Sequence, residues 1–159
     1  MSKFHLEGGC HCGAIRYTLS EPALSVQHCH CECCKKVSGA MFGTGAAVNP
    51  TAVSITGEDN LTRYRSSPSM PEDFCKTCGC HLFAYEESEP DIMYILPYTL
   101  DGGVHPGHPA DKEAHTYMSF KAQWDRTADD LPKYDTYSPD EIITGLQREE
   151  NSELNGEST

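Results

Sequence analysis

Nine cysteines in three short clusters constrain the fold of this chain more than any other feature of its 159-residue sequence. They are Cys10 and Cys12, then Cys29, Cys31, Cys33 and Cys34, and finally Cys75, Cys78 and Cys80. Thiols that lie two or three residues apart can converge on one soft metal ion, which needs three or four ligands from a compact region. The spacing therefore predicts a zinc protein.

A disulfide framework is the alternative interpretation of so many cysteines. The cysteine count is odd, and the first five residues lack the apolar stretch of a secretory signal. The longest apolar runs, such as residues 92–96, are far too short to cross a bilayer. We therefore expect a cytoplasmic location, where thiols stay reduced and clustered cysteines serve metal binding or catalysis. Disulfides with one free thiol remain the minor alternative.

The net charge of −12 limits the partners that this chain can have. An acidic surface repels the phosphates of nucleic acids and the head groups of anionic membranes. The largest basic cluster is the pair Lys35 and Lys36. We expect neither a nucleic-acid partner nor a membrane partner, although cysteine pairs at this spacing also occur in nucleic-acid-binding zinc ribbons.

Short alternating segments predict an all-β fold. Strands are expected at residues 10–19, 24–28, 41–48, 53–57, 61–65, 80–85, 92–96 and 115–120. Pro, Gly and Ser predict loops at residues 66–72 and 99–109. One helical turn is expected at residues 35–39, directly after the central cysteines.

The chain is expected to form one domain followed by a polar tail. Residues 1–138 form the predicted zinc domain, and residues 139–159 form the tail. Six acidic residues and one basic residue lie in the last twenty positions. A short helix is possible at residues 139–147, and residues 150–159 are expected to be disordered.

The outer cysteine pairs predict one closed metal site. In a strand, residues i and i+2 point to the same side, so Cys10 and Cys12 can face one ion. Cys75 and Cys78 supply two more thiolates, and four thiolates around zinc make a tetrahedral structural site. A glycine follows each pair, which argues against four unrelated buried thiols.

The central cluster predicts a different site. Cys29, Cys31 and Cys34 supply three thiolates, and three protein ligands plus an open position are typical of a catalytic zinc. The alternative is a second closed site that Cys33, Cys80 or a histidine completes. Cys80, two residues after Cys78, is an alternative ligand in place of Cys75 or Cys78, or a residue that lines the pocket. The preferred interpretation is that Cys33 and Cys80 are buried thiols without a ligand role.

Three histidines near these clusters carry weaker expectations. His11 and His30 sit between predicted ligands and should point away from the sulfurs in an extended backbone. His115 begins a predicted strand and can face a pocket. A surface or hydrogen-bonded structural role is the more frequent one for such a histidine.

A zinc with three thiolates carries a net charge of −1, so it is a poor Lewis acid and an unsuitable activator of water. It is soft, and an incoming thiol is an apt fourth ligand. The metal would lower the pKa of that thiol and hold it as a thiolate. Making or breaking a bond between this sulfur and an electrophilic carbon is the expected chemistry, for example release of a small aldehyde from a hemithioacetal.

The same motifs resemble the glutathione-dependent formaldehyde-activating enzyme family, also called the GFA or CENP-V domain family. The matching runs are residues 9–17, 29–35, 38–40 and 74–79, with weaker matches at residues 99–101, His115, Trp124 and residues 131–132. Together they cover residues 5–135. The resemblance implies an Mss4-like, all-β fold and a carbon–sulfur lyase whose reference substrate is S-hydroxymethylglutathione.

The resemblance also implies the metal ligands. It places a structural zinc on Cys10, Cys12, Cys75 and Cys78, and a second zinc on Cys29, Cys31 and Cys34. These sets agree with those argued from spacing. The implied partner is a small thiol or thiol adduct, with glutathione as the candidate thiol.

Two positions depart from the family pattern. Asp73 stands where a basic residue usually precedes Phe-Cys, and Lys35 stands where an arginine is common. Glutathione carries two carboxylates, so an acidic protein needs local cations to bind it. The candidates are Lys35, Lys36, Arg63 and Arg65.

Three functions are compatible with these observations. The first is a zinc-dependent carbon–sulfur lyase that acts on a thiol adduct of a small aldehyde. The second is a non-catalytic zinc-binding module for protein interaction on the same scaffold. The third, a zinc-ribbon nucleic-acid binder, is disfavoured by the charge of −12.

Overall fold

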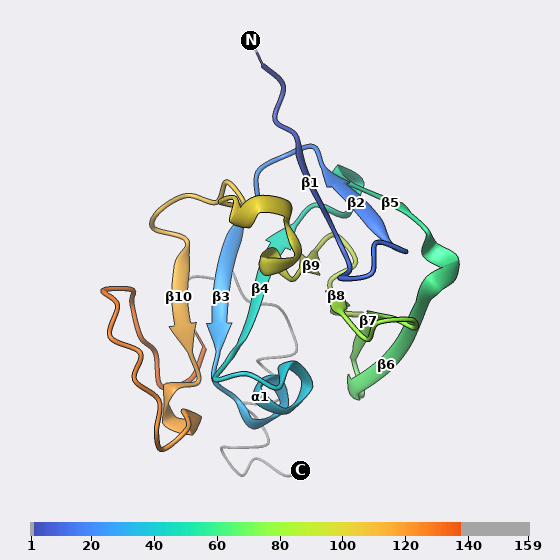
Figure 1. Ribbon diagram of the computed structural model, residues 1–159. Helices are drawn as coiled ribbons and strands as arrows, with labels where there is room; N and C mark the ends of the chain where they lie inside the picture. The colour runs from blue at the N-terminus through green and yellow to red at the C-terminus, as the bar shows by residue number, and fades with distance from the viewer. Residues whose placement is uncertain (1, 138–159) are drawn as a thin grey trace.

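A computed structural model describes residues 2–137 of the chain (Figure 1). The strands are β1 (Leu6–Gly9), β2 (Arg16–Leu19), β3 (Ser25–Cys29), β4 (Gly43–Val48), β5 (Val53–Thr56), β6 (Leu61–Ser67), β7 (Met70–Cys75), β8 (His81–Tyr85), β9 (Met93–Ile95) and β10 (Glu113–Thr116). The α-helix is α1 (Glu32–Ser38), and five short 3₁₀ turns accompany it: η1 (Pro50–Ala52), η2 (Glu58–Asn60), η3 (Pro97–Thr99), η4 (Asp101–Gly103) and η5 (Met118–Phe120). The predicted tail and helix beyond residue 138 lie outside the described residues.

The strands form two sheets. One has three strands in the order β1-β2-β5, and the other has seven in the order β10-β3-β4-β9-β8-β7-β6. The pairs within both sheets are antiparallel except for β10 and β3, which run parallel. The long connection from β9 to β10 makes this possible, because parallel neighbours need a crossover rather than a hairpin.

The hydrophobic core lies between the two sheets. Tyr17 of β2 meets Phe83 of β8 edge-on, with ring centroids 5.3 Å apart. Phe83, Ile95 and Ala46 lie side by side on β8, β9 and β4, and all three are fully buried. One face of the seven-stranded sheet is therefore committed to packing, which leaves the opposite face for other roles.

Helix α1 lies near the end of β3 and the start of β4 (Figure 1). Cys31 caps its first turn, because the sulfur accepts a hydrogen bond from the backbone N–H of Cys34. Gly39 ends it in the left-handed region, at φ 63°. A Cβ on Gly43 would lie only 3.0 Å from the Cβ of Cys34, so this glycine permits the close approach of α1 to β4.

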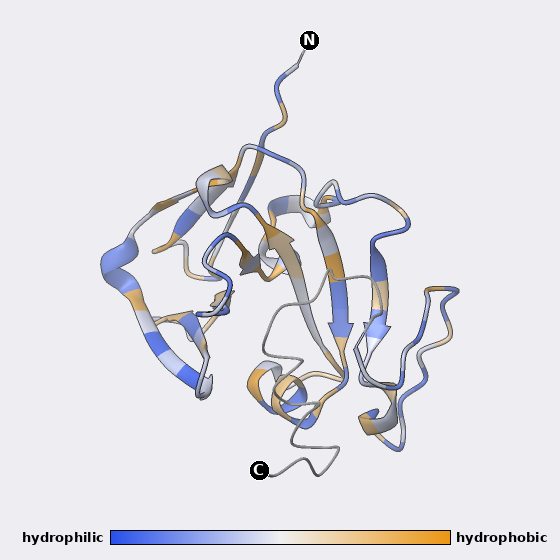
Figure 2. Ribbon diagram, turned by 180° about the vertical axis from the view of Figure 1, so that it is seen from behind, coloured by the Kyte–Doolittle hydropathy of each residue, from blue (hydrophilic) through white to orange (hydrophobic). Residues whose placement is uncertain are grey.

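Polarity follows the sheet positions. Figure 2 shows hydrophilic colour along β6, the edge strand, and apolar colour toward the end of β4, in the middle of the sheet. Charged edge strands discourage pairing with another chain. Within residues 2–137, the one α-helix has seven residues, and no helix has the length and apolar character that a membrane span requires.

The all-β prediction is confirmed, and most expected strands are found within a few residues of their predicted ends. The loop prediction for residues 66–72 is wrong, because β6 and β7 form a hairpin that turns at Pro68 and Ser69. The last strand, predicted at 115–120, is β10 and ends at Thr116, where Tyr117 takes a left-handed conformation with φ 56°. The proline and serine content of residues 66–72 is typical of a loop, whereas the pairing of β6 with β7 shows a hairpin.

Candidate functional site

Four cysteines from two turns converge at one end of the three-stranded sheet. Cys10 and Cys12 lie in the turn between β1 and β2; Cys75 is the last residue of β7, and Cys78 lies in the turn that follows it. Their four Sγ atoms all lie within 4.8 Å of one another. The Sγ of Cys12 is 3.6 Å from that of Cys10 and 3.7 Å from that of Cys75. Tetrahedral zinc with Zn–S bonds of about 2.3 Å places its sulfurs roughly 3.8 Å apart, so the donor set fits this metal.

Both turns depend on a glycine in the left-handed region. Gly13 has φ 81° and Gly79 has φ 76°. The prediction that residues 10–19 form one strand is therefore wrong at its start, because a positive φ at Gly13 breaks the extended backbone. The two sulfurs of the first pair still face one point, but the turn brings them there and not strand alternation.

Backbone N–H groups support thiolates in this cluster. The N–H of Ile15 donates to the Sγ of Cys10 at 3.3 Å, and that of Cys78 donates to the Sγ of Cys75 at 3.5 Å. The backbone N–H groups of Cys12 and Cys80 lower the pKa of Cys78 to about 6. Metal ligands must be deprotonated, so these contacts favour the thiolate form of Cys78, whereas the neighbouring sulfurs raise the pKa of Cys12 to about 12.

A second cluster joins the end of β3 to the first turn of α1. Cys29 ends β3, Cys31 caps the helix and Cys34 lies in its first turn; their three Sγ atoms all lie within 4.8 Å of one another. The pKa of Cys31 is lowered to about 3, because the thiols of Cys29 and Cys34 and nearby backbone N–H groups surround its sulfur. Three soft donors around one point also fit zinc, with no fourth cysteine in the set.

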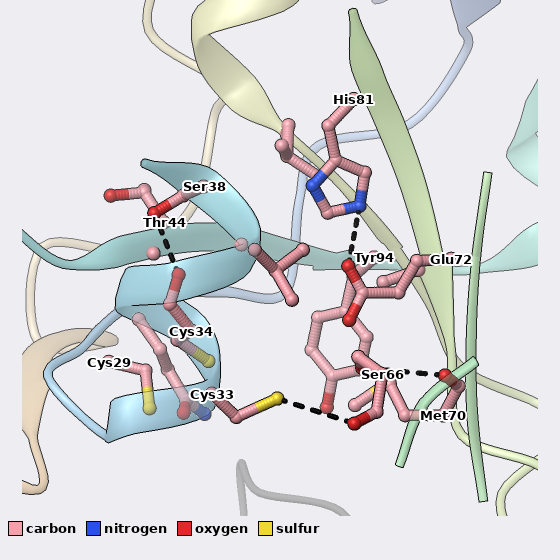
Figure 3. A pocket seen from close by; sticks show the side chains of 16 residues that line it. Cys29, Cys33, Cys34, Ser38, Thr44, Ser66, Met70, Glu72, His81 and Tyr94 are labelled. Carbon is pink, nitrogen blue, oxygen red and sulfur yellow. Dashed lines mark hydrogen bonds and ion pairs between the residues drawn. The ribbon is translucent and has the colours of Figure 1, made fainter. Parts of the chain in front are cut away.

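A pocket opens beside this second cluster. It lies between α1 and the face of the seven-stranded sheet that points away from the core, and its volume is about 120 Å³ (Figure 3). Glu72, Ala84 and Tyr94 form one row across β7, β8 and β9, on the side of the pocket that the sheet provides. The lining residues are Gln27, Cys29, Cys33, Cys34, Val37, Ser38, Gly43, Thr44, Gly45, Ser66, Met70, Glu72, His81, Ala84, Tyr94 and Leu96.

The pocket distinguishes the two clusters. Cys29 and Cys34 belong to the three-sulfur set and also line the pocket. None of the four cysteines in the other set lines it. A metal held by the three-sulfur set therefore has a cavity beside it in which a further ligand can bind.

Cys33 and Cys80 belong to neither cluster. Cys33 lines the pocket, and its sulfur lies 3.7 Å from the carbonyl oxygen of Ser66. Cys80 lies 3.7 Å from the carbonyl oxygen of His81. The expectation that both thiols are buried is wrong, because each is only half-buried. All nine cysteines are free thiols in this structure.

Buried histidines form a network behind the three-cysteine cluster. The Nε2 of His30 lies 2.9 Å from the Nδ1 of His115, and the Nε2 of His115 lies 2.9 Å from Asp129. The Nδ1 of His30 lies 3.1 Å from a carboxylate oxygen of Asp125. His115 does not line the pocket, and its hydrogen bonds give it the structural role that such histidines usually have. His11, in contrast, is exposed.

The predicted binders of glutathione carboxylates have other contacts. Arg63 donates to both oxygens of Asp73, at 2.7 and 2.9 Å, so the two charges compensate each other at this departure from the family pattern. Arg65 pairs with Glu87. Lys35 donates to the carbonyl oxygen of Phe120 at 2.7 Å. Of the described residues that line the pocket, none is a lysine or an arginine.

Sequence reasoning missed the wall opposite the cysteines. Glu72 and His81 carry the charged groups there, with the Nε2 of His81 3.0 Å from a carboxylate oxygen of Glu72. Glu72 was missed because it lies in residues 66–72, which were predicted to form a loop. For His81, the register shifts by one residue between Asp73 and Phe74, so His81 instead of Leu82 lies opposite Phe74. Such a bulge re-aims a side chain and leaves no clear trace in the sequence.

The fold and the clusters define a β-sheet protein with two candidate metal centres, one closed and one beside a pocket. The sequence profile of the family described as "Glutathione-dependent formaldehyde-activating enzyme" matches residues 5–119. The chain belongs to this family.

Individual relatives support the assignment. A Halomonas elongata protein that carries the family's name is 27% identical over 130 residues, which cover 75% of this chain and 78% of that protein. A Schizosaccharomyces pombe protein named an uncharacterized lyase is 38% identical over 104 residues, or 64% of this chain and 69% of that one. A crystal structure of a Rhodobacter sphaeroides protein superposes with a TM-score of 0.51 and 28% identity, covering 64% of this chain and 92% of that one.

Proposed function

We propose that this chain is a zinc-dependent carbon–sulfur lyase that acts on a thiol adduct of a small aldehyde, similar to S-hydroxymethylglutathione. The observation that carries the proposal is the position of Cys29 and Cys34, which belong to a three-sulfur set and line a pocket. Family membership supports the same chemistry. In this proposal Cys10, Cys12, Cys75 and Cys78 hold a structural zinc, and Cys29, Cys31 and Cys34 hold a catalytic one.

A zinc ion held by the three thiolates would supply soft positive charge that stabilises a thiolate sulfur. The chain's own residues define the space around that sulfur. Val37, Met70 and Leu96 give the pocket apolar walls, and Tyr94 crosses its floor above Gly45. Apolar walls exclude water and favour a short aldehyde-derived group over a charged one.

The pocket receives the reacting end of the adduct in this proposal. The charged ends of glutathione would lie outside it, because the described residues that line it include no lysine or arginine. The identity of the thiol is therefore open to test. Glutathione and 2-mercaptoethanol, which is small and uncharged, are the informative pair to compare.

The testing experiment measures exchange between ¹³C-formaldehyde and its hemithioacetal by NMR, with zinc-loaded protein and with either thiol. An exchange rate above that of the uncatalysed mixture, and dependent on zinc, is the expected result. Zinc per chain is measured by elemental analysis before and after mild chelation. We expect two zinc ions, one of which leaves readily together with the activity.

The experiment also separates the rival function. A chain that holds two zinc ions but does not accelerate exchange with either thiol contradicts the lyase proposal. That result would favour a non-catalytic zinc-binding module. Cys80→Ser is a suitable control variant, because this thiol lies in neither cluster and does not line the pocket.

A further inference from the structure

The wall of the pocket opposite the cysteines carries a buried carboxylate whose surroundings differ from those of the other buried acids. Glu72, Asp73 and Glu86 are three buried acidic residues in the described part of the chain, with exposures of 6%, 4% and 1%. A fourth carboxylate, that of Asp125, is 2% exposed at its side chain and is held by Thr127 and His30. A carboxylate taken out of water is costly unless hydrogen bonds or an opposite charge compensate it. The three differ in how far this is done.

Two of the three are fully compensated. Both oxygens of Asp73 accept hydrogen bonds from Arg63, at 2.7 and 2.9 Å. Glu86 accepts from the backbone N–H and the hydroxyl of Ser88, at 3.2 and 3.1 Å, and from the hydroxyl of Ser69 at 3.4 Å. Neither residue lines the pocket. Their carboxylates serve the structure of the turn and the strand pair that hold them.

Within residues 2–137, the ion pair of Glu72 is made by one of its two oxygens. Its Oε2 lies 3.0 Å from the Nε2 of His81, and Figure 3 shows the other oxygen turned away from His81, beside Tyr94. The same ring nitrogen lies 3.2 Å from the carbonyl oxygen of Phe83. Because a carbonyl oxygen can only accept, Nε2 carries the proton of the ring. His81 therefore presents an N–H to the carboxylate and fixes its orientation.

The strand pairing directs this carboxylate to the pocket. Glu72 pairs with Ala84, and Ala84 pairs with Tyr94, and all three line the cavity. Asp73, the next residue, pairs with Phe83 of the core-facing row. The ring of His81 is held from the other side by Phe74, on which it stacks at 4.4 Å.

We propose that Glu72 is the catalytic base of this pocket and that His81 positions its carboxylate. The inference rests on the proposed function. A carboxylate kept in an apolar pocket, with one oxygen oriented by a histidine and the other directed at the cavity, is a typical arrangement for proton transfer. In this arrangement the cysteines on one wall lie toward the sulfur of the adduct, and Glu72 on the opposite wall accepts the proton of its hydroxyl.

The step balances without any further reactant. The hydroxyl proton of the adduct R–S–CH₂–OH passes to the carboxylate of Glu72. The electron pair of that O–H bond becomes the second bond of the aldehyde carbonyl. The carbon–sulfur bond breaks, and the sulfur keeps its electron pair as a thiolate. In reverse, the thiolate adds to the carbonyl carbon and Glu72 returns the proton to the oxygen.

The test replaces the carboxylate by a group of the same shape. In Glu72→Gln we expect kcat for exchange to fall about 100-fold or more, the range that general base catalysis supplies. KM for the adduct should stay within about threefold, because the lost interaction acts on the transition state. Zinc content and the binding constant of 2-mercaptoethanol, measured by calorimetry, should be unchanged. In Glu72→Ala, added formate should restore part of the lost rate.

Asp73→Asn is the matched control, since it alters the neighbouring buried carboxylate on the opposite face of β7. It should lower the melting temperature and leave kcat within about threefold of the wild type. Full activity in Glu72→Gln, or a loss that formate does not restore in Glu72→Ala, would overturn the inference and leave the lyase proposal standing. A wild-type chain without exchange activity overturns both. A fall in kcat as large in Asp73→Asn as in Glu72→Gln also counts against Glu72.

Discussion

The four-cysteine cluster and the three-cysteine cluster use the same kind of ligand in different surroundings. The first joins the turn after β1 to the end of β7, where Cys12 and Cys75 are 63 positions apart in sequence, and none of its four cysteines lines the pocket. The second is assembled within six residues, from Cys29 to Cys34, and opens on a cavity. A long-range cluster is suited to holding distant segments together, and a local one beside a cavity is suited to chemistry. The difference teaches that two cysteine clusters with the same kind of donor can differ in whether they open on a pocket, and our proposal assigns their roles on that difference.

The largest expected effect comes from breaking the four-cysteine cluster. Cys75 is buried and its sulfur lies within the set that ties β7 to the turn after β1. Structural zinc sites contribute on the order of 10 kcal/mol to folding in small peptides. Cys75→Ser should therefore lose the cooperative unfolding transition, followed by circular dichroism on heating. A Cys75→Ser variant that melts like the wild type would show that this cluster is not a structural site.

Breaking the three-cysteine cluster should remove activity and spare the fold. In Cys31→Ser the serine hydroxyl can still cap α1, because serine is a favoured N-cap residue. We expect one zinc per chain to be retained, a melting temperature within a few degrees, and a loss of exchange activity of at least about 100-fold. Elemental analysis, thermal unfolding followed by circular dichroism and the NMR exchange assay measure these three quantities. Retained activity would remove the reason to call this cluster catalytic.

The smallest effect should come from the network behind the three-cysteine cluster. The hydrogen bond from His115 holds the pKa of Asp129 well below its usual range. A lowered pKa in the folded state stabilises the protein above the unfolded-state value of about 4, and this contribution is lost as the pH falls. Because Asp129 is 45% exposed, Asp129→Asn should cost no more than about 1 kcal/mol at pH 7.

Urea unfolding of wild type and Asp129→Asn at several pH values checks this prediction. The difference in unfolding free energy should be present at pH 7 and shrink progressively below about pH 4. Lys133→Met is a control that removes the ion pair of Lys133 with Asp129, at 3.2 Å, and keeps the hydrogen bonds from His115 and from the backbone N–H of Leu131. If the difference in unfolding free energy between wild type and Asp129→Asn grows toward low pH, the hydrogen bond from His115 does not stabilise the ionised form of Asp129.

The ligand sets could be predicted because their information is local. Cys75 and Cys78 with Gly79, and likewise Cys10 and Cys12 with Gly13, specify a turn in which two sulfurs face one point. The general character of the fold followed from short alternating segments and frequent turns. Three-dimensional contacts confirmed which pairs come together but did not change the sets.

The wall opposite the cysteines could not be predicted in the same way. Residues 66–72 have the composition of a loop, yet pairing with β6 and β8 makes most of this segment strand and buries Glu72. The pairing partner outweighed local preference, because β structure is stabilised across strands more than along them. Strand pairing also explains why a basic residue expected at the site has another contact. Arg63 lies opposite Asp73 in the β6–β7 pair and donates a hydrogen bond to it.

The sequence by itself determined which cysteines form the two clusters, the all-β character and the membership of the family. These depend on residue type and short spacing, which the chain carries whatever its tertiary contacts. Only the tertiary structure decided that one cluster opens on a pocket and that Glu72 and His81 face it. Those facts depend on strand register and on one bulge in β8, and a shift of a single residue would turn each side chain to the opposite face of the sheet.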